Sequence, residues 1–125
     1  MRKSNAKYRF RRPDWAKIRQ WCALMAGDTR RAILLELASE PMDAATLAKR
    51  LEKRLGKRFS AIGNDLRRLR SENLVEANRG DKWRVYRLAS NVRTRRRHGR
   101  VLLEFLGEDG ACLTIVTRNR RRRAD

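Results

Sequence analysis

Short stretches with helical periodicity, each bounded by a capping or turn residue, constrain the fold of this chain more than any other feature. Apolar residues recur at three- and four-residue spacings in four segments, 13–26, 28–39, 43–56 and 60–73. In the third segment Leu47, Leu51 and Leu55 are four residues apart, which places them on one face of a helix. The segment 28–39 is apolar over most of its circumference, as expected of a helix that others surround. The pattern therefore predicts four helices, of which 28–39 is the central one and the other three pack around it.

The ends of these predicted helices carry residues suited to capping. Gly27 and Gly56 are suited to ending helices, because glycine readily adopts the backbone conformation found there. We expect Asp28, Asp43 and Ser60 to be the N-caps of the last three helices. Aspartate and serine side chains accept hydrogen bonds from the free N–H groups of a first helical turn. These residues set the expected helix boundaries.

A short β-hairpin is expected after the helices. Residues 75–88 alternate between apolar and polar side chains around Gly80 and Asp81, which are a turn signal between two strand-like runs. Consecutive helices followed by such a hairpin form the pattern of a winged helix-turn-helix, in which the hairpin is the wing. The predicted fold class is therefore mainly α with a small β wing (α+β).

The pattern is less definite after the hairpin. Residues 90–100 are strongly basic and are expected to form a short helix or an irregular connection. Residues 101–117 favour a second hairpin with GEDG as its loop, while 101–106 can equally end a helix that starts at Ser90. Periodicity does not distinguish strand from helix in so short a run. We expect the extension 91–117 to be either a β-hairpin or a dimerisation element.

The net charge restricts the partners of the chain. Its 125 residues include 33 Lys and Arg against 14 Asp and Glu, which gives a formal charge of +19. Such an excess repels itself in a compact molecule and usually indicates a polyanionic partner, here DNA, RNA or an anionic membrane. A membrane role is not expected, because no apolar run approaches the roughly 18 residues of a spanning helix. No apolar stretch behind the basic N-terminus indicates a signal peptide.

The residue types that usually carry redox, metal or catalytic chemistry are few. Cys22 and Cys112 lie far apart and outside any Cys or His cluster, so we expect buried thiols in a reducing cytoplasm, with the protein associated with the nucleoid. His98 is expected to be exposed near phosphates rather than to bind a metal. No cofactor is predicted, and without a nucleophile placed beside the single histidine we expect that the protein is not an enzyme.

The predicted helix 60–73 has the outer face of a recognition helix, the element that enters the major groove of duplex DNA. Ser60 and the first backbone N–H groups suit a phosphate at the positive end of the helix. The small residues Ala61 and Gly63 would allow the backbone to approach the DNA closely. This end of the helix is therefore the expected point of closest contact.

Further along the same face are side chains suited to bases and to phosphates. Asn64 can pair with adenine, and Arg67 can pair with guanine or a phosphate. Arg68 and Arg70 are better placed for the DNA backbone. The wing adds three basic side chains that can reach an adjacent minor groove, Arg79, Lys82 and Arg84.

Several motifs lie along residues 20–90, namely ALMAGDTRRAILLELA at 23–38, Leu47-Ala48, Ser60-x-Ile62, Leu66-x-x-Leu69, Leu74-Val75 and Arg84-x-Tyr86-Arg87-Leu88. With these motifs the chain resembles the ArsR-type transcriptional repressors, which are dimeric winged-helix proteins of bacteria. Gly63 and Asp65 stand where that family usually has Ser and His, which places Asp65 near phosphates. The clustered metal ligands of the family's sensors are missing here, so metal sensing is not carried over, and no small-molecule effector is identified.

The resemblance also implies a homodimer, because the family forms its dimer interface with the first and last helices. In the first predicted helix the interface candidates are Trp15, Ile18 and Trp21. No last helix is evident, since 101–117 looks like an addition. A palindromic duplex would match the two-fold symmetry of such a dimer.

The sequence thus predicts a winged helix-turn-helix that regulates transcription, most simply as a repressor. Its expected parts are a basic arm 1–12, the DNA-binding domain 13–90, the extension 91–117 and a basic tail 118–125. Two other classes stay open. One is an RNA-binding or ribosome-associated module that uses the same basic surface, and the other is an architectural protein that coats DNA without sequence preference.

Overall fold

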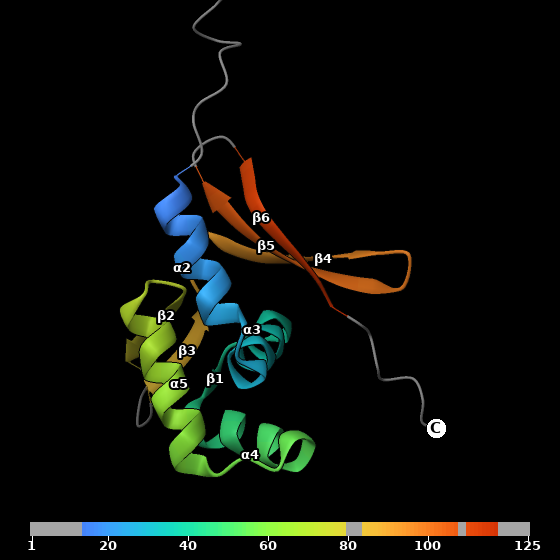
Figure 1. Ribbon diagram of the computed structural model, residues 1–125. Coiled ribbons are helices and arrows are strands. Elements are labelled where there is room, and N and C mark those ends of the chain that lie inside the picture. The colour runs from blue at the N-terminus through green and yellow to red at the C-terminus, as the bar shows by residue number, and fades with distance from the viewer. Residues whose placement is uncertain (1–13, 80–83, 108–109, 118–125) are drawn as a thin grey trace, which may run out of the picture.

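The computed structural model describes residues 14–79, 84–107 and 110–117 of the chain (Figure 1). In these residues the elements follow in the order α2 (Trp15–Met25), α3 (Asp28–Ser39), β1 (Met42–Asp43), α4 (Ala44–Leu55), α5 (Phe59–Ser71), β2 (Val75–Arg79), β3 (Arg84–Leu88), β4 (Val92–Arg97), β5 (Arg100–Gly107) and β6 (Gly110–Thr117). The four helices predicted from the sequence are all present. The predicted arm 1–12, the wing turn 80–83 and the tail 118–125 lie outside the described residues.

The helix starts confirm one expected N-cap and correct two. Asp43 caps α4, since its carboxylate accepts a hydrogen bond of 2.7 Å from the backbone N–H of Thr46, and this bond lowers the pKa of Asp43. The prediction is wrong for Asp28 and Ser60, which lie inside α3 and α5. Gly27 and Arg58 take those two cap positions with extended backbones, so α3 begins at Asp28 itself and α5 begins one residue before Ser60.

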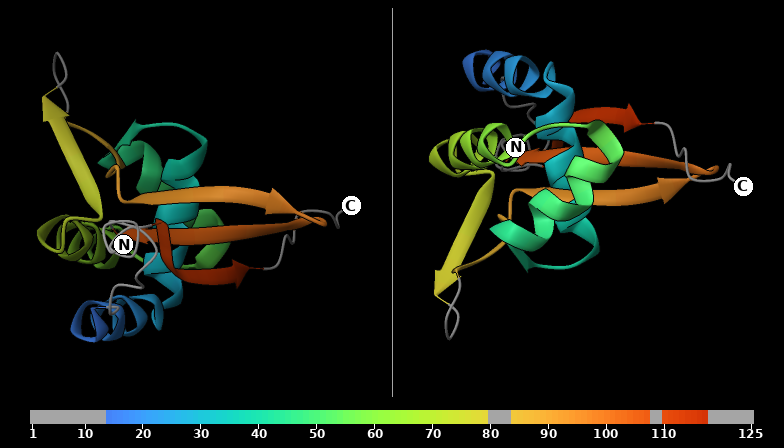
Figure 2. Two further views of the ribbon diagram at one scale, coloured as in Figure 1. Left: turned by 90° about the horizontal axis from the view of Figure 1, so that it is seen from above. Right: turned by 90° about the horizontal axis from the view of Figure 1, so that it is seen from below.

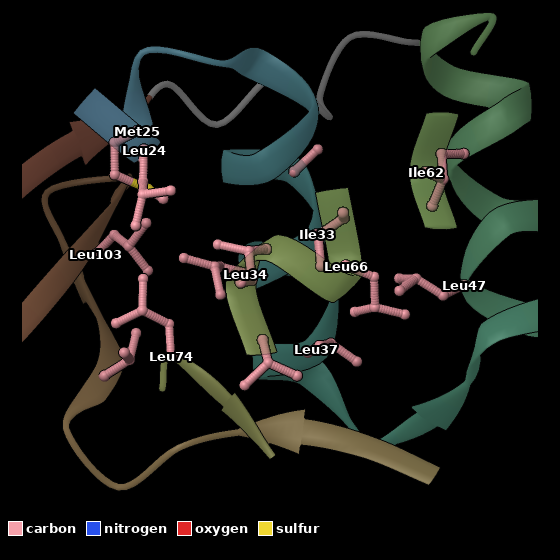
Figure 3. Close-up of a cluster of buried hydrophobic side chains, with 14 of the residues drawn as sticks. Leu24, Met25, Ile33, Leu34, Leu37, Leu47, Ile62, Leu66, Leu74 and Leu103 are labelled. Atoms are coloured by element: carbon pink, nitrogen blue, oxygen red, sulfur yellow. The ribbon is translucent and has the colours of Figure 1, made fainter. Parts of the chain in front are cut away.

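The hydrophobic core surrounds α3, as the sequence predicted (Figure 3). Ile33 and Leu34 of α3 have no exposed surface, and Leu37 is 3% exposed. The helices α4 and α5 and the start of the wing face them with further buried residues, namely Leu47, Leu51, Ile62, Leu66, Leu69, Leu74 and Val75. Because these positions recur every three or four residues on α4 and α5, each helix buries one face and exposes the other.

The strands β2 and β3 form the predicted wing. They pair antiparallel, from Val75 opposite Leu88 at the base to Arg79 opposite Arg84 beside the turn. The two-residue strand β1, just before α4, pairs with the other edge of β3, so the sheet order is β1-β3-β2. The helices α3, α4 and α5 with this sheet form a winged helix-turn-helix, which confirms the predicted fold class.

The segment after the wing differs from expectation, because residues 92–97 form the strand β4 rather than a helix or an irregular connection. The second hairpin predicted over 101–117 is present as β5 and β6, and β4 adds a third strand to it in the order β4-β5-β6. The helical alternative for 101–106 is therefore wrong. Within β4, Val92 is buried while the next residue Arg93 is exposed, which is the two-residue period of a strand.

This C-terminal sheet shares the core of the winged domain. Leu103 and Phe105 of β5 have no exposed surface, and the Phe105 ring lies 5.3 Å from that of Trp21 on α2. Such a ring pair stabilises the fold by about 0.5–1.5 kcal/mol beyond the contribution of the buried area alone. The sheet is thus fixed relative to α2 and is part of the same folded body.

Both cysteines are exposed, which corrects the expectation of buried thiols. On α2 the buried positions are Trp21, Leu24 and Met25, and Cys22 lies outside that stripe. On β6 the neighbour of Cys112, Leu113, packs against the core. Adjacent residues of a strand point to opposite faces, so the Cys112 side chain lies on the outer face of the sheet.

Candidate nucleic-acid interface

The helix α5 has one buried and one exposed face. Ile62, Leu66 and Leu69 are at most 2% exposed and pack towards the core. On the other side lie the α5 residues that the sequence predicted as DNA contacts, with Gly63 half-buried and the rest exposed, namely Ser60, Ala61, Asn64, Arg67, Arg68 and Arg70. The structure therefore brings all seven of these residues onto the accessible side of one helix. Figure 1 shows α5 beside the wing strands β2 and β3.

Gly63 is not required by packing. A Cβ atom built on it would meet no atom of the described residues within 4 Å. Glycine inside a helix is less favourable than alanine by about 0.8–1.0 kcal/mol, and no contact with the described residues offsets this cost at Gly63. A bare backbone at this point leaves room for close approach from outside.

Replacing Gly63 with alanine is expected to raise the free energy of unfolding by about 0.5–1 kcal/mol, because the helix gains propensity without a clash. The same substitution is expected to weaken duplex binding if α5 lies deep in a groove. Chemical denaturation and a duplex titration on the same sample measure the two effects. Lower stability would show that the glycine serves the fold instead.

The polar side chains of α5 are arranged by contacts with one another and with α2. Arg67 donates a hydrogen bond from Nη2 to the amide oxygen of Asn64, one turn earlier. Arg68 lies 3.6 Å from the carboxylate of Glu72, which also accepts a hydrogen bond from Gln20 of α2. Arg68 is thus partly neutralised, while Asn64 and Arg67 are held together on the open face.

Asp65, which the resemblance placed near phosphates, is paired within the protein. Its carboxylate is 3.0 Å from Nη1 of Arg30, and both side chains are about a quarter exposed. Arg30 also donates from Nε to the carbonyl oxygen of Leu24 at 2.6 Å. This contact connects α5 with the end of α2 and the start of α3, so Asp65 helps to fix the orientation of α5.

Glu36 of α3 and Glu40, which follows α3 directly, pair with two arginines of α4. Arg50 lies 3.2 Å from Glu36 and 3.0 Å from Glu40, and Arg54 lies 2.7 Å from Glu36. The hydrogen bond that Arg50 donates to Glu36 is the largest of several contacts that raise the pKa of Arg50. The charges of these two arginines are therefore partly neutralised within the protein, whereas the arginines of α5 face outward.

Two of the three basic residues predicted for the wing lie within the described residues and are exposed. Arg79 and Arg84 are exposed and directly opposite each other in the register of β2 and β3. Lys82 lies outside the described residues. A further wing arginine, Arg87, lies 3.4 Å from Glu76 on the neighbouring strand. Like charges directly opposite each other are unfavourable unless an anion lies near them, so the Arg79–Arg84 pair suits a phosphate backbone.

The three residues predicted for a dimer interface have different surroundings. Trp15 is 62% exposed and Ile18 is half-buried. Trp21 is only 3% exposed and packs on Phe105, so it belongs to the core of its own chain. The sequence placed all three on one helical face, but it gave no sign that Phe105 of β5 covers Trp21.

The α3–α5 helices, the open basic face of α5 and the adjacent hairpin define this chain as a winged helix-turn-helix protein. Its fold is similar to that of HlyU from Vibrio cholerae, with a TM-score of 0.55 and 28% identity over 62% of this chain and 79% of that chain. It is also similar to the homodimeric winged helix-turn-helix DNA-binding domain of Mb0332 from Mycobacterium bovis, a possible ArsR-family transcriptional regulator. That match has a TM-score of 0.51 and 25% identity over 61% of this chain and 67% of that domain.

Comparisons by sequence give no match, either to a protein-family model or to a curated protein. The two structural matches leave more than a third of this chain unmatched. Among the described helices none is long and apolar enough to cross a membrane. Within the same part of the chain, no three His, Cys, Asp or Glu side chains gather in a way that could hold a metal ion.

Proposed function

We propose that this protein is a transcription regulator, acting as a repressor, that binds duplex DNA sequence-specifically with α5 in the major groove. The observation that carries the proposal is the outer face of α5, where Asn64 and three arginines are exposed and the nearby acids Asp65 and Glu72 are paired. The winged fold shared with a Mycobacterium bovis domain described as DNA-binding supports the same function. The site of action would be the nucleoid in the cytoplasm.

In this proposal each residue of the face has a part. Asn64 and Arg67, joined by their hydrogen bond, read base edges, since amide and guanidinium groups pair with adenine and guanine in the major groove. Ser60 lies in the first turn of α5, where free N–H groups and the helix dipole favour a phosphate. Arg68 and Arg70 contact the DNA backbone on either side.

The remaining contacts set affinity and symmetry. The wing, through Arg79, Lys82 and Arg84, lies along the adjacent minor groove or the backbone and adds affinity that depends little on sequence. Two copies bind a palindromic site, and the exposed Trp15 with Ile18 on α2 forms part of their interface. The described C-terminal sheet occupies the place in the chain where the resemblance implied a last helix, so α2 would meet different elements across the dimer.

A competition experiment at one fixed salt concentration tests the proposal. A duplex that the protein has selected from a random-sequence pool is labelled and bound. It is then displaced by the same duplex without label, by random duplex or by structured RNA. The selected duplex is expected to compete better than random duplex by a factor of about 10³ or more, and RNA is expected to compete poorly. Equal competition by RNA would indicate an RNA-binding module. A duplex specificity ratio near one would indicate an architectural protein.

A further inference from the structure

The hairpin turn between β4 and β5 carries an unusual density of positive charge. Arg96, Arg97, His98 and Arg100 are all exposed there. Arg97 lies opposite Arg100 in the register of the two strands, which leaves His98 and Gly99 as a two-residue loop. Both loop residues have positive φ, 50° and 77°, as in the tight turns that match the twist of a two-stranded ribbon. The β4–β5 hairpin therefore ends in a tight turn with a basic tip.

The charge of this tip is not balanced by acids in the described residues. Glu104 of β5 pairs with Arg93 at 2.7 Å and with Arg95 at 3.5 Å, and Glu104 itself is 5% exposed. No ion pair within the described part of the chain reaches Arg96, Arg97 or Arg100. The like-charged Arg97–Arg100 pair opposes folding unless an anion lies beside it. Glu104 thus neutralises arginines near the core end of the hairpin, and the tip stays positive.

The hairpin is held firmly at its base. Val92 of β4 and Leu103 and Phe105 of β5 are buried in the shared core. The tip is consequently positioned by the same packing that positions α2 and α3, and a ligand bound at the tip would be fixed relative to the rest of the molecule.

The basic tip and the recognition helix lie at opposite ends of the molecule. In Figure 2 both views place α5 and the wing at one end, while the turn between β4 and β5 projects from the other. The strand β6 ends beside the tip, because Thr117 pairs with Val101, next to Arg100. From Thr117 the chain continues into residues 118–125, which include five arginines. A duplex bound at α5 therefore contacts the end of the molecule opposite the tip.

We propose that the β4–β5 tip is a second duplex-DNA contact, so that one molecule bound through α5 bridges to a separate segment of DNA. This inference rests on the proposed function for the first segment. Only the turn 97–100 projects beyond β6, which pairs with β5 as far as Val101. The major groove of B-form DNA is about 12 Å wide and admits a two-stranded ribbon, so it has room for this turn, whereas the major groove of A-form RNA is deep and too narrow for side chains to read. The shape of the tip therefore favours DNA, with its arginines on the phosphates that border the groove.

A two-duplex capture experiment tests this proposal. A duplex from the selected pool is immobilised, the protein is bound to it, and a labelled random-sequence duplex is added in solution. The wild-type chain is expected to retain the labelled duplex. Replacing Arg96, Arg97 and Arg100 with alanine is expected to reduce that retention about tenfold or more, because three arginines no longer neutralise phosphates. Binding to the immobilised duplex, measured separately, is expected to change little.

Matched variants separate the tip from charge in general. Lys17→Ala with Arg19→Ala removes positive charge from α2 and is expected to leave capture near the wild-type level. Glutamine at the same three tip positions, which keeps most of the side-chain length, is expected to lose capture as alanine does. Thermal unfolding of each variant confirms that it is folded.

Four results would overturn the proposal. Capture by the tip variants at the wild-type level would show that the bridge forms elsewhere, for example through the α5 helices of two copies. Retention of a labelled structured RNA in preference to the duplex would assign the tip to RNA. Wild-type protein that occupies the immobilised duplex but retains no second duplex would refute the bridge alone. Failure to bind the immobilised duplex would refute the proposed function as well.

Discussion

Replacing Arg67 with alanine is expected to weaken binding to the preferred duplex by about 1–3 kcal/mol, roughly 5- to 150-fold, while binding to random duplex changes much less. The reason is its position. Arg67 is exposed on the outer face of α5 and is oriented by its hydrogen bond to Asn64, so it can present a fixed donor pair to a guanine edge. Fluorescence anisotropy titrations of the two duplexes at one salt concentration measure both affinities.

The neighbouring arginine provides the control. Arg68 is equally part of α5 and exposed, but it lies 3.6 Å from Glu72 and is assigned to the DNA backbone. Its replacement with alanine is expected to lower the affinity of both duplexes alike and to leave their ratio unchanged. If Arg67→Ala instead behaves like Arg68→Ala, Arg67 contacts phosphate and the base-reading assignment is wrong.

Raising the salt concentration from 50 to 200 mM is expected to reduce duplex affinity by about 10³–10⁵ if six to ten phosphates are contacted. The formal charge of +19 makes such a number of contacts attainable. Removing residues 118–125 takes away five arginines and one aspartate, so it is expected to weaken all sequences alike. The slope of log affinity against log salt would become shallower by about 0.9 for each phosphate that the tail had neutralised.

The truncated chain should keep its sequence preference, because the α5 face is untouched. Titrations of the preferred and random duplexes across a salt series give the slope and the specificity ratio together. A truncation that changes the ratio and leaves the slope unchanged would contradict the assignment of the tail to general charge. An unchanged slope with an unchanged ratio would show that the tail makes no DNA contact.

The helices and the wing could be predicted because their apolar residues follow a single period. The stripe of Leu47, Leu51 and Leu55 shows this for α4, where helix and cap appear as expected, with Leu47 and Leu51 buried and Leu55 half-buried. The segment 92–97 could not be assigned in this way, because arginine occurs on both faces of β4 and conceals the two-residue alternation. The dipeptide His98-Gly99 was the available signal, since residues that tolerate positive φ favour a two-residue hairpin turn.

The residues on the outer face of α5 could be predicted because its apolar residues also follow a single helical period. The side chains from distant segments that contact the helices could not. The partner of Asp65 is Arg30, which is 35 residues away, and nothing local indicates that pairing. Likewise the burial of Trp21 depends on Phe105, which comes from a strand added after the winged domain. Side-chain contacts between distant segments follow from the tertiary packing, so a single sequence gives no pattern from which to infer them.

Selection of bound sites from a random duplex pool, performed in parallel with the wild-type chain and with Asn64→Ala, tests the central claim most directly. We predict a palindromic consensus for the wild-type chain, and for the variant a consensus that loses its base preference at symmetric adenine positions and is otherwise retained. An identical consensus for both proteins, or none for the wild-type chain, would contradict the assignment of base reading to the outer face of α5.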